Sequence, residues 1–239
     1  MSVKPSVQFQ QESSDQQTHQ KEVRSMFDVV APKYDLMNDV MSMGIHRLWK
    51  AKCVKLLDPC YGETIVDLAG GTGDLAAQFI KRGAKAIVCD PCLGMMNATS
   101  VKKSDQIDWV AAYGETLPFA DNSLDGLSIA FGLRNMSNPE QGLREIYRTL
   151  KPGGRFLCLE FSHAAPWLKP IYDAYSIHII PQLGALIAGE KQAYKYLIES
   201  IREFPDQITL AGMMHDCGFQ KVQFQNLSFG IAAIHTGIK

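Results

Sequence analysis

With 239 residues, the chain is long enough to bury a large apolar core, and we expect one α/β domain that carries an additional segment. Its 24 basic and 25 acidic residues give a net charge of −1, so no charge field exists to hold nucleic acid, and we expect no nucleic-acid partner. Six cysteines lie scattered through the chain, several in apolar runs, which indicates a reducing compartment. The C-x-x-C pair of Cys89 and Cys92 lacks the second pair or histidine cluster of a zinc site, so we expect no metal.

The sequence also bears on the membrane. Residues 177–188 are apolar but too few and too interrupted for the ~18 residues that a spanning helix needs. The N-terminal segment has neither the apolar core of a secretory signal nor the early arginines of a transit peptide. We therefore expect a cytoplasmic protein, at most peripheral at the inner face of the membrane.

The N-terminal segment differs in composition from the rest. Residues 1–21 are rich in glutamine and serine and almost free of apolar side chains, which is typical of a disordered tail. We assign residues 22–239 to the folded domain. Within residues 22–34, apolar side chains recur every three or four positions, which predicts an amphipathic helix that ends near Pro32 and lies over the core.

The following polar and aromatic stretch, residues 33–50, has more functional side chains than a plain linker. It is suited to form a lid or a substrate wall. The alternative is that Tyr34 and Trp49 are packing aromatics and His46 is a hydrogen-bonded structural histidine. The spacing does not decide between the two.

Residues 65–74, with the sequence IVDLAGGTGD, predict a buried strand that breaks into a glycine-rich turn, and a helix follows. Glycines in the turn allow positive φ angles and leave backbone amides open to a ligand; they are Gly70, Gly71 and Gly73. Their spacing is not that of a dinucleotide site, and the nearby acids Asp67 and Asp74 suit a cationic ligand without phosphate. S-adenosylmethionine, with its ammonium and sulfonium charges, fits this pattern.

Two further strands extend the prediction. Residues 86–90 form an apolar strand that ends in Asp90, which is placed to accept both ribose hydroxyls of such a cofactor. Residues 108–113 form the next strand, after which Tyr113 and Gly114 lie where an adenine ring could bind. The alternative, a glycine turn that only connects strand and helix, leaves the acids around it unexplained.

A fourth strand, residues 124–131, leads into Arg134 and Asn135. Because open α/β sheets bind ligands at the carboxyl ends of their strands, we expect both side chains at the ligand-binding edge. A helix follows, with Asn138 as its cap and Pro139 at its first position.

The C-terminal part completes the sheet. After a fifth strand over residues 155–161, residues 163–204 interrupt the alternation with a long, aromatic-rich helical insertion. A helix over residues 207–216 and strands over residues 222–227 and 231–238 follow, and the last two are close enough to pair as a hairpin. The pattern predicts an α/β, Rossmann-like class I methyltransferase fold: a seven-stranded, mostly parallel sheet with an antiparallel last strand.

Two motifs outside the general fold pattern, GIHRLWK at residues 44–50 and FGLRN at residues 131–135, make a family resemblance specific. Together with DLAGGTGD at residues 67–74, they resemble the ubiquinone/menaquinone biosynthesis C-methyltransferases, which methylate a ring carbon of a polyprenylated quinol. The resemblance runs from about residue 22 to the end of the chain.

This resemblance implies cofactor contacts from Thr72, from Asp90 and from residues 113–114. The chain departs from the family pattern in three places. Residues 113–114 stand where a small polar residue and an alanine are usual, Pro91 follows the ribose-binding acid, and Ala130 replaces a serine. If that serine acts through its hydroxyl, the contact at Ala130 is absent here.

Methylation of a quinol carbon requires loss of a phenolic proton. A phenol with a pKa near 10 is roughly 4 kcal/mol from ionisation at pH 7, and a guanidinium about 4 Å away offers attraction of similar size. We expect Arg134 to stabilise the phenolate and Asn135 to orient the ring oxygen. The base is left open among Tyr34, Asp35 and His46. The alternative for Arg134 is a salt bridge to a surface acid.

The expected substrate is a polyprenyl quinol, either a benzoquinol, a naphthoquinol or both. The insertion could cap a channel for its prenyl tail, although an ordinary packed pair of helices has the same composition. Expected partners are a membrane surface, other enzymes of quinone biosynthesis and a second copy of the chain. Two other functions remain open: O- or N-methylation of a soluble small molecule, and a cofactor-binding scaffold without catalysis.

Overall fold

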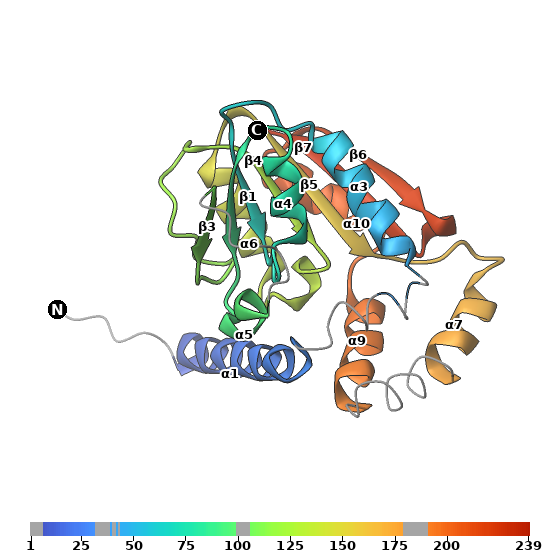
Figure 1. The fold of residues 1–239 in the computed structure, drawn as a ribbon. Helices are drawn as coiled ribbons and strands as arrows, with labels where there is room; N and C mark the ends of the chain where they lie inside the picture. Colours follow the sequence, from blue (N-terminus) through green and yellow to red (C-terminus); the bar gives the residue numbers. More distant parts are fainter. Residues whose placement is uncertain (1–6, 32–38, 40–41, 43, 99–105, 179–190) are drawn as a thin grey trace.

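The computed structural model describes residues 7–31, 39, 42, 44–98, 106–178 and 191–239, which form a single sheet flanked by helices (Figure 1). Its strands are β1 (Thr64–Leu68), β2 (Lys85–Cys89), β3 (Ile107–Val110), β4 (Leu124–Ala130), β5 (Leu150–Phe161), β6 (Gln220–Leu227) and β7 (Ala232–Ile238). They lie in the order β3-β2-β1-β4-β5-β7-β6, and β7 runs antiparallel to both of its neighbours. The predicted seven-stranded sheet with an antiparallel last strand is confirmed.

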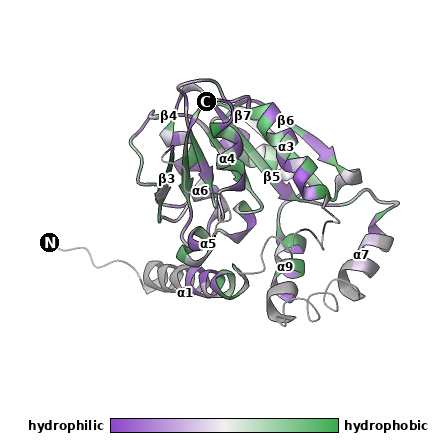
Figure 2. Cartoon of the chain, in the orientation of Figure 1, coloured by the Kyte–Doolittle hydropathy of each residue, from purple (hydrophilic) through white to green (hydrophobic). Residues whose placement is uncertain are grey.

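Each face of the sheet has its own hydrophobic layer. Side chains alternate along a strand, so Ile65 of β1 packs toward α3 (Ile45–Leu57) and α4 (Asp74–Ile80), and Val66 packs toward the opposite face. That opposite face is covered by α6 (Pro139–Thr149) and α10 (Gln207–Asp216). Figure 2 shows hydrophobic residues concentrated along the central strands between these helices. Burial on both faces explains why the central strands consist mostly of apolar residues.

Most strand boundaries agree with the sequence to within a few residues, but β5 begins earlier than predicted. It starts at Leu150, not Arg155, because Leu150 pairs with Leu124 of β4 across a register shift. The predicted helix start is confirmed, since the Asn138 side chain accepts a 3.0 Å hydrogen bond from the amide of Gln141.

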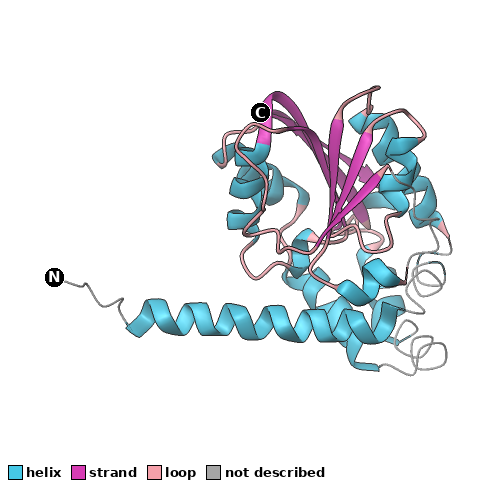
Figure 3. Ribbon diagram, turned by 60° about the vertical axis from the view of Figure 1, so that its left-hand side comes forward, coloured by secondary structure: helices cyan, strands magenta, loops and turns pink. Residues whose placement is uncertain are grey.

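The N-terminal segment differs from the expected disorder of residues 1–21. Helix α1 (Val7–Val30) begins within that segment, and its first half projects beyond the α/β body (Figure 3). Its second half lies along α5 (Leu93–Asn97), where Phe27 and Ala31 pack against Cys92 and Met95. Composition predicted disorder because the early part is polar; the helix described here continues N-terminally from a packed apolar segment.

The insertion over residues 163–204 contains α7 (Lys169–His178) and α9 (Lys191–Glu203). Helix α9 meets the short helix η2 (Leu133–Asn135), where the Tyr196 hydroxyl donates a 3.2 Å hydrogen bond to Oδ1 of Asn135. The insertion therefore contacts the carboxyl end of β4. In the part of the chain that the structure describes, no helix is long and apolar enough to cross a membrane.

Candidate functional site

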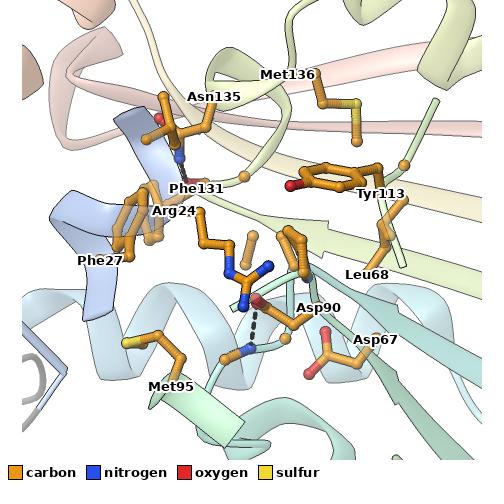
Figure 4. A pocket seen from close by; sticks show the side chains of 18 of the residues that line it. Arg24, Phe27, Asp67, Leu68, Asp90, Met95, Tyr113, Phe131, Asn135 and Met136 are labelled. Carbon is orange, nitrogen blue, oxygen red and sulfur yellow. Dashed lines mark hydrogen bonds between the residues drawn. The ribbon is translucent and has the colours of Figure 1, made fainter. Parts of the chain in front are cut away.

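A cavity that is partly open to solvent lies at the carboxyl ends of β1, β2 and β4 (Figure 4). Parallel α/β sheets bind their ligands at this edge. Ten predicted site residues line it: Asp67, Gly70, Gly71, Thr72, Asp74, Asp90, Tyr113, Gly114, Ala130 and Asn135.

The glycine-rich turn between β1 and α4 forms the floor of the cavity. Gly71 and Gly73 have φ angles of 52° and 78°, in the region that favours glycine. A side chain at Gly73 would come within 2.9 Å of the Trp109 ring, so this glycine keeps the turn tight although it does not line the cavity. Gly70 and Gly71 line the cavity, and their contact with a ligand through the backbone stays a prediction.

Asp90 is held at the end of β2 by two backbone donors. The Gly71 amide donates to its Oδ2 at 2.9 Å, and the Cys92 amide donates to its Oδ1 at 2.7 Å. Burial raises the pKa of Asp90 to about 6, and these two hydrogen bonds oppose the rise. A carboxylate oxygen can accept a second hydrogen bond, so Asp90 can receive the two hydroxyls of a ribose.

Asp67 is the more deeply buried acid. Its Oδ1 accepts a 3.0 Å hydrogen bond from the Ser128 hydroxyl, and its Oδ2 accepts one of 3.3 Å from the Ala76 amide. Desolvation raises the pKa of Asp67 to about 7, opposed by the Ser128 hydrogen bond and by the charge of Lys50. An ammonium group bound in the cavity would favour the charged form of this carboxyl group.

Another part of the cavity has a mostly apolar lining. Figure 4 shows Tyr113, Leu68 and Met136 around it. A side chain at Gly114 would meet the end of the flexible Met136 side chain, so glycine at this position leaves room for Met136. Ala130 lines the cavity with a methyl group, and a hydroxyl contact from this side chain is absent.

Helix α1 contributes a wall that the sequence analysis did not predict. Arg24 and Phe27 point from α1 into the cavity (Figure 4). Asp28 fixes the helix in place, because its Oδ1 accepts hydrogen bonds from the Gly94 amide at 3.1 Å and from the Cys92 thiol at 3.0 Å. The apolar stripe of residues 22–34 indicated a helix over the core; it did not indicate a cavity beneath that helix.

Arg134 lies elsewhere than predicted. Its Nη1 is 3.0 Å from Oε2 of Glu160 on β5, and both side chains are buried, with 5% and 2% exposed. Nη1 also donates to the Phe131 carbonyl at 2.6 Å, and the backbone amide of Arg134 donates to Glu160 at 3.3 Å. The guanidinium does not line the cavity, whereas Asn135 does. Arg134 therefore forms a salt bridge, as the alternative in the sequence analysis stated, but its partner Glu160 is a buried acid and not a surface acid.

Of the three candidate bases, the structure describes only His46. Tyr34 and Asp35 lie outside the described residues. His46 is buried with its Nδ1 2.8 Å from Oγ of Ser42, and burial lowers its pKa. It does not line the cavity, and its hydrogen bond matches the structural alternative. Trp49 packs in the core against Phe131, with ring centroids 6.2 Å apart.

Further residues also line the cavity. Sequence reasoning did not assign cavity positions to Gln20, Arg24, Phe27, Lys50, Met95, Glu115, Phe131 and Met136. Lys50 is the last residue of the GIHRLWK motif, to which the sequence pattern assigned no separate role. Within the described ranges, no group of histidine, cysteine and acidic residues is arranged to hold a metal ion. Cys89 and Cys92 are buried free thiols.

Comparison with known proteins bears on this geometry. The sequence profile of the ubiE/COQ5 methyltransferase family matches residues 14–239. The chain belongs to this family. Membership makes S-adenosylmethionine the methyl donor, as the glycine turn and its acids predicted. The match begins within α1, upstream of the predicted domain boundary.

Two relatives show how much of the chain is shared. A protein of Rubrivivax gelatinosus named ubiquinone/menaquinone biosynthesis C-methyltransferase UbiE is 49% identical over 97% of this chain and 92% of its own length. A Dictyostelium discoideum protein named 2-methoxy-6-polyprenyl-1,4-benzoquinol methylase, mitochondrial, is 44% identical over 91% of this chain and 81% of its own. The similarity therefore includes the insertion.

Solved structures support the fold alone. The [4+2]-cyclase SpnF matches with a TM-score of 0.68 at 17% identity, covering 91% of this chain and 94% of SpnF. A putative methyltransferase in complex with the Haloferax volcanii Trm112 activator matches with a TM-score of 0.64 at 18% identity, covering 89% of this chain and 96% of the other. A cyclase on the same fold shows why function must be argued from the site.

Proposed function

We propose that this chain transfers a methyl group from S-adenosylmethionine to a ring carbon of a polyprenylated quinol, in ubiquinone or menaquinone biosynthesis. The family match through nearly the whole chain carries this proposal, because relatives named for this reaction are 44–49% identical over more than nine tenths of it. The site agrees with it: two buried carboxyl groups, a glycine turn and an apolar slot meet in one cavity.

Each end of the cavity has a distinct part in binding. When bound, the cofactor supplies an electrophilic methyl group on a sulfonium sulfur. Asp90 would accept the ribose hydroxyls, and the slot beside Tyr113 and Gly114 would hold the adenine. Asp67 would face the ammonium group, where its charge favours a cation without phosphate. The open side of the cavity remains for the acceptor.

The acceptor must lose a phenolic proton, and the structure changes which residue we assign to that step. Because Glu160 neutralises Arg134, the guanidinium offers little net attraction to a phenolate. We infer that the Arg134–Glu160 pair positions η2, and that Asn135 orients the ring oxygen. The Asn135 amide is itself fixed, by donation to the Phe131 carbonyl at 3.2 Å and by the Tyr196 hydroxyl. Tyr34 and Asp35 remain proposed bases.

A prenylated acceptor resides in a bilayer, so the proposal includes a membrane contact. Trp167 and Phe229 are 63% and 66% exposed and stack edge to face, 5.2 Å apart, beside the start of the insertion. Phe229 has φ 58° and ψ 34°, a strained conformation for an aromatic residue. Exposed aromatic side chains partition into the membrane interface. We propose that this pair contacts the lipid surface from which the acceptor enters.

Vesicle sedimentation tests the membrane contact. The double variant Trp167→Asn, Phe229→Asn should bind phosphatidylglycerol/phosphatidylethanolamine vesicles more weakly than the parent chain. Tyr61→Asn, which removes an aromatic side chain with 92% exposure elsewhere, should bind as the parent does. Equal binding by all three proteins would rule out this contact. Assembly with other quinone-biosynthesis enzymes or with a second copy stays a prediction.

Turnover with purified protein tests the reaction itself. Labelled S-adenosylmethionine is supplied with a methoxy-benzoquinol or with a demethylmenaquinol, and mass spectrometry identifies the methylated product. Methylation of either quinol at carbon supports the proposal. Methylation of only soluble phenols or amines would favour the alternative acceptor class, and cofactor binding without any product would favour a scaffold.

A further inference from the structure

Lys50 and Asp74 form an ion pair at the entrance of the glycine turn. Lys50 lies on α3, and its Nζ is 3.1 Å from Oδ2 of Asp74 in the first turn of α4. Both residues line the cavity beside Thr72. Lys50 is mostly buried, with 13% of its side chain exposed, whereas Asp74 is 49% exposed. The ammonium group is therefore kept at the cavity wall although a lysine normally extends into water.

The location of this pair identifies the part of a ligand that would meet it. Asp90 and the slot at Gly114 mark the nucleoside end, and the Gly70–Gly71 turn with Asp67 marks the other end. The charge of Lys50 acts on Asp67, whose pKa it lowers against the effect of burial. Lys50 thus belongs to the end where the amino-acid portion of S-adenosylmethionine would lie.

That portion is a zwitterion with one ammonium and one carboxylate. The negative charges of Asp67 and Asp74 can attract the ammonium group. The carboxylate needs a cation or several hydrogen-bond donors. An ammonium group has three N–H donors, so Lys50 can bind Asp74 and a ligand carboxylate together. Arg24 is another cation at the cavity, but it is 3.9 Å from Asp28 on the α5 side, near the residues that fix Asp90.

We propose that Lys50 binds the α-carboxylate of the cofactor, and that Asp74 holds Lys50 in place for this contact. The inference rests on the proposed function for the identity of the cofactor. It adds a residue that distinguishes a cofactor with an intact amino-acid end from one that lacks the carboxylate. It predicts that ligands lacking the carboxylate do not depend on Lys50.

Calorimetry with two ligands tests this. S-adenosylhomocysteine carries the carboxylate, whereas decarboxylated S-adenosylhomocysteine keeps the nucleoside and the ammonium group and lacks only the carboxylate. Lys50→Met should weaken S-adenosylhomocysteine binding about 10- to 100-fold, the range for losing a hydrogen bond between charged groups. It should leave binding of the decarboxylated ligand unchanged. Lys55→Met, an exposed lysine on the same helix, should change neither affinity.

Other outcomes have distinct meanings. Equal loss for both ligands would overturn the assignment, because Lys50 would then act through the turn, and so would unchanged affinity for both. A carboxylate-specific loss in Arg24→Met with none in Lys50→Met would transfer the role to Arg24. If the parent chain binds S-adenosylhomocysteine but methylates no quinol, the proposed acceptor fails and the Lys50 assignment stands. If it does not bind that ligand, the cofactor assignment itself fails.

Discussion

Replacing Arg134 by methionine removes one partner of the buried ion pair with Glu160. The substitution keeps much of the apolar side-chain volume and deletes the charge that lies 3.0 Å from the Glu160 carboxylate. Glu160 would keep the hydrogen bonds from the amides of Phe161 and Arg134, at 3.0 and 3.3 Å. It would otherwise be an unpaired carboxylate on β5, enclosed in the core.

The expected cost follows from that burial. Removing one partner of a buried pair typically costs about 3–5 kcal/mol, because the remaining charge is uncompensated. In a chain of this size each kcal/mol shifts the melting temperature by roughly 2–4 °C, so we expect a fall of about 6–20 °C. Burial raises the pKa of Glu160 and Arg134 opposes that rise, so the unpaired acid would take up a proton more readily, which places a limit on the cost.

Thermal unfolding followed by circular dichroism measures the effect. Glu160→Gln in the Arg134→Met background should recover part of the loss, since no buried charge remains. The matched control is Arg144→Met: Arg144 is 2.9 Å from Glu140, but both side chains are 62% exposed, so the cost should be below about 1 kcal/mol. An Arg134→Met protein with an unchanged melting temperature and lost turnover would refute this reasoning and restore a direct role in the reaction.

Three further predictions concern the cofactor. Asp90→Ala should weaken S-adenosylhomocysteine binding by about 1.5–3 kcal/mol in calorimetry, while the exposed Asp108→Ala should not, and equal affinities would remove Asp90 from the site. Burial raises the pKa of Asp67 to about 7, and only its charged form attracts an ammonium group, so the affinity for S-adenosylhomocysteine should rise as the pH increases toward 7 and then level off. Asp67→Asn should flatten this pH dependence. An Asp67→Asn protein with the same pH dependence as the parent chain would contradict the prediction. Asp28→Ala removes the two hydrogen bonds that hold α1 over α5, so it should weaken S-adenosylhomocysteine binding several-fold and make α1 accessible to trypsin. An unchanged rate of proteolysis would mean that other contacts hold the helix.

Local sequence patterns predicted the cofactor side of the site. The glycine turn, Asp67 and Asp90 follow directly from strand ends, and each contact there joins residues close in sequence or on neighbouring strands. Gly114 could also be placed, because it follows the predicted third strand.

Contacts over long sequence separations could not be predicted. Arg134 was expected at the ligand edge because η2 follows β4, but its partner Glu160 is on another strand and nothing in the local pattern selects it among the acids. The same holds for α1: Asp28 reaches Gly94 across 66 residues. The polar composition of residues 1–21 indicated disorder, whereas α1 begins at Val7 within that segment.

A crystal structure with S-adenosylhomocysteine tests the central claim most directly. The account predicts the adenine beside Tyr113 and Gly114, both ribose hydroxyls on Asp90, and the amino-acid end between Asp67 and Lys50. S-adenosylhomocysteine bound at a place other than this cavity would contradict the account. So would S-adenosylhomocysteine bound in the reverse direction, with its amino-acid end at Gly114.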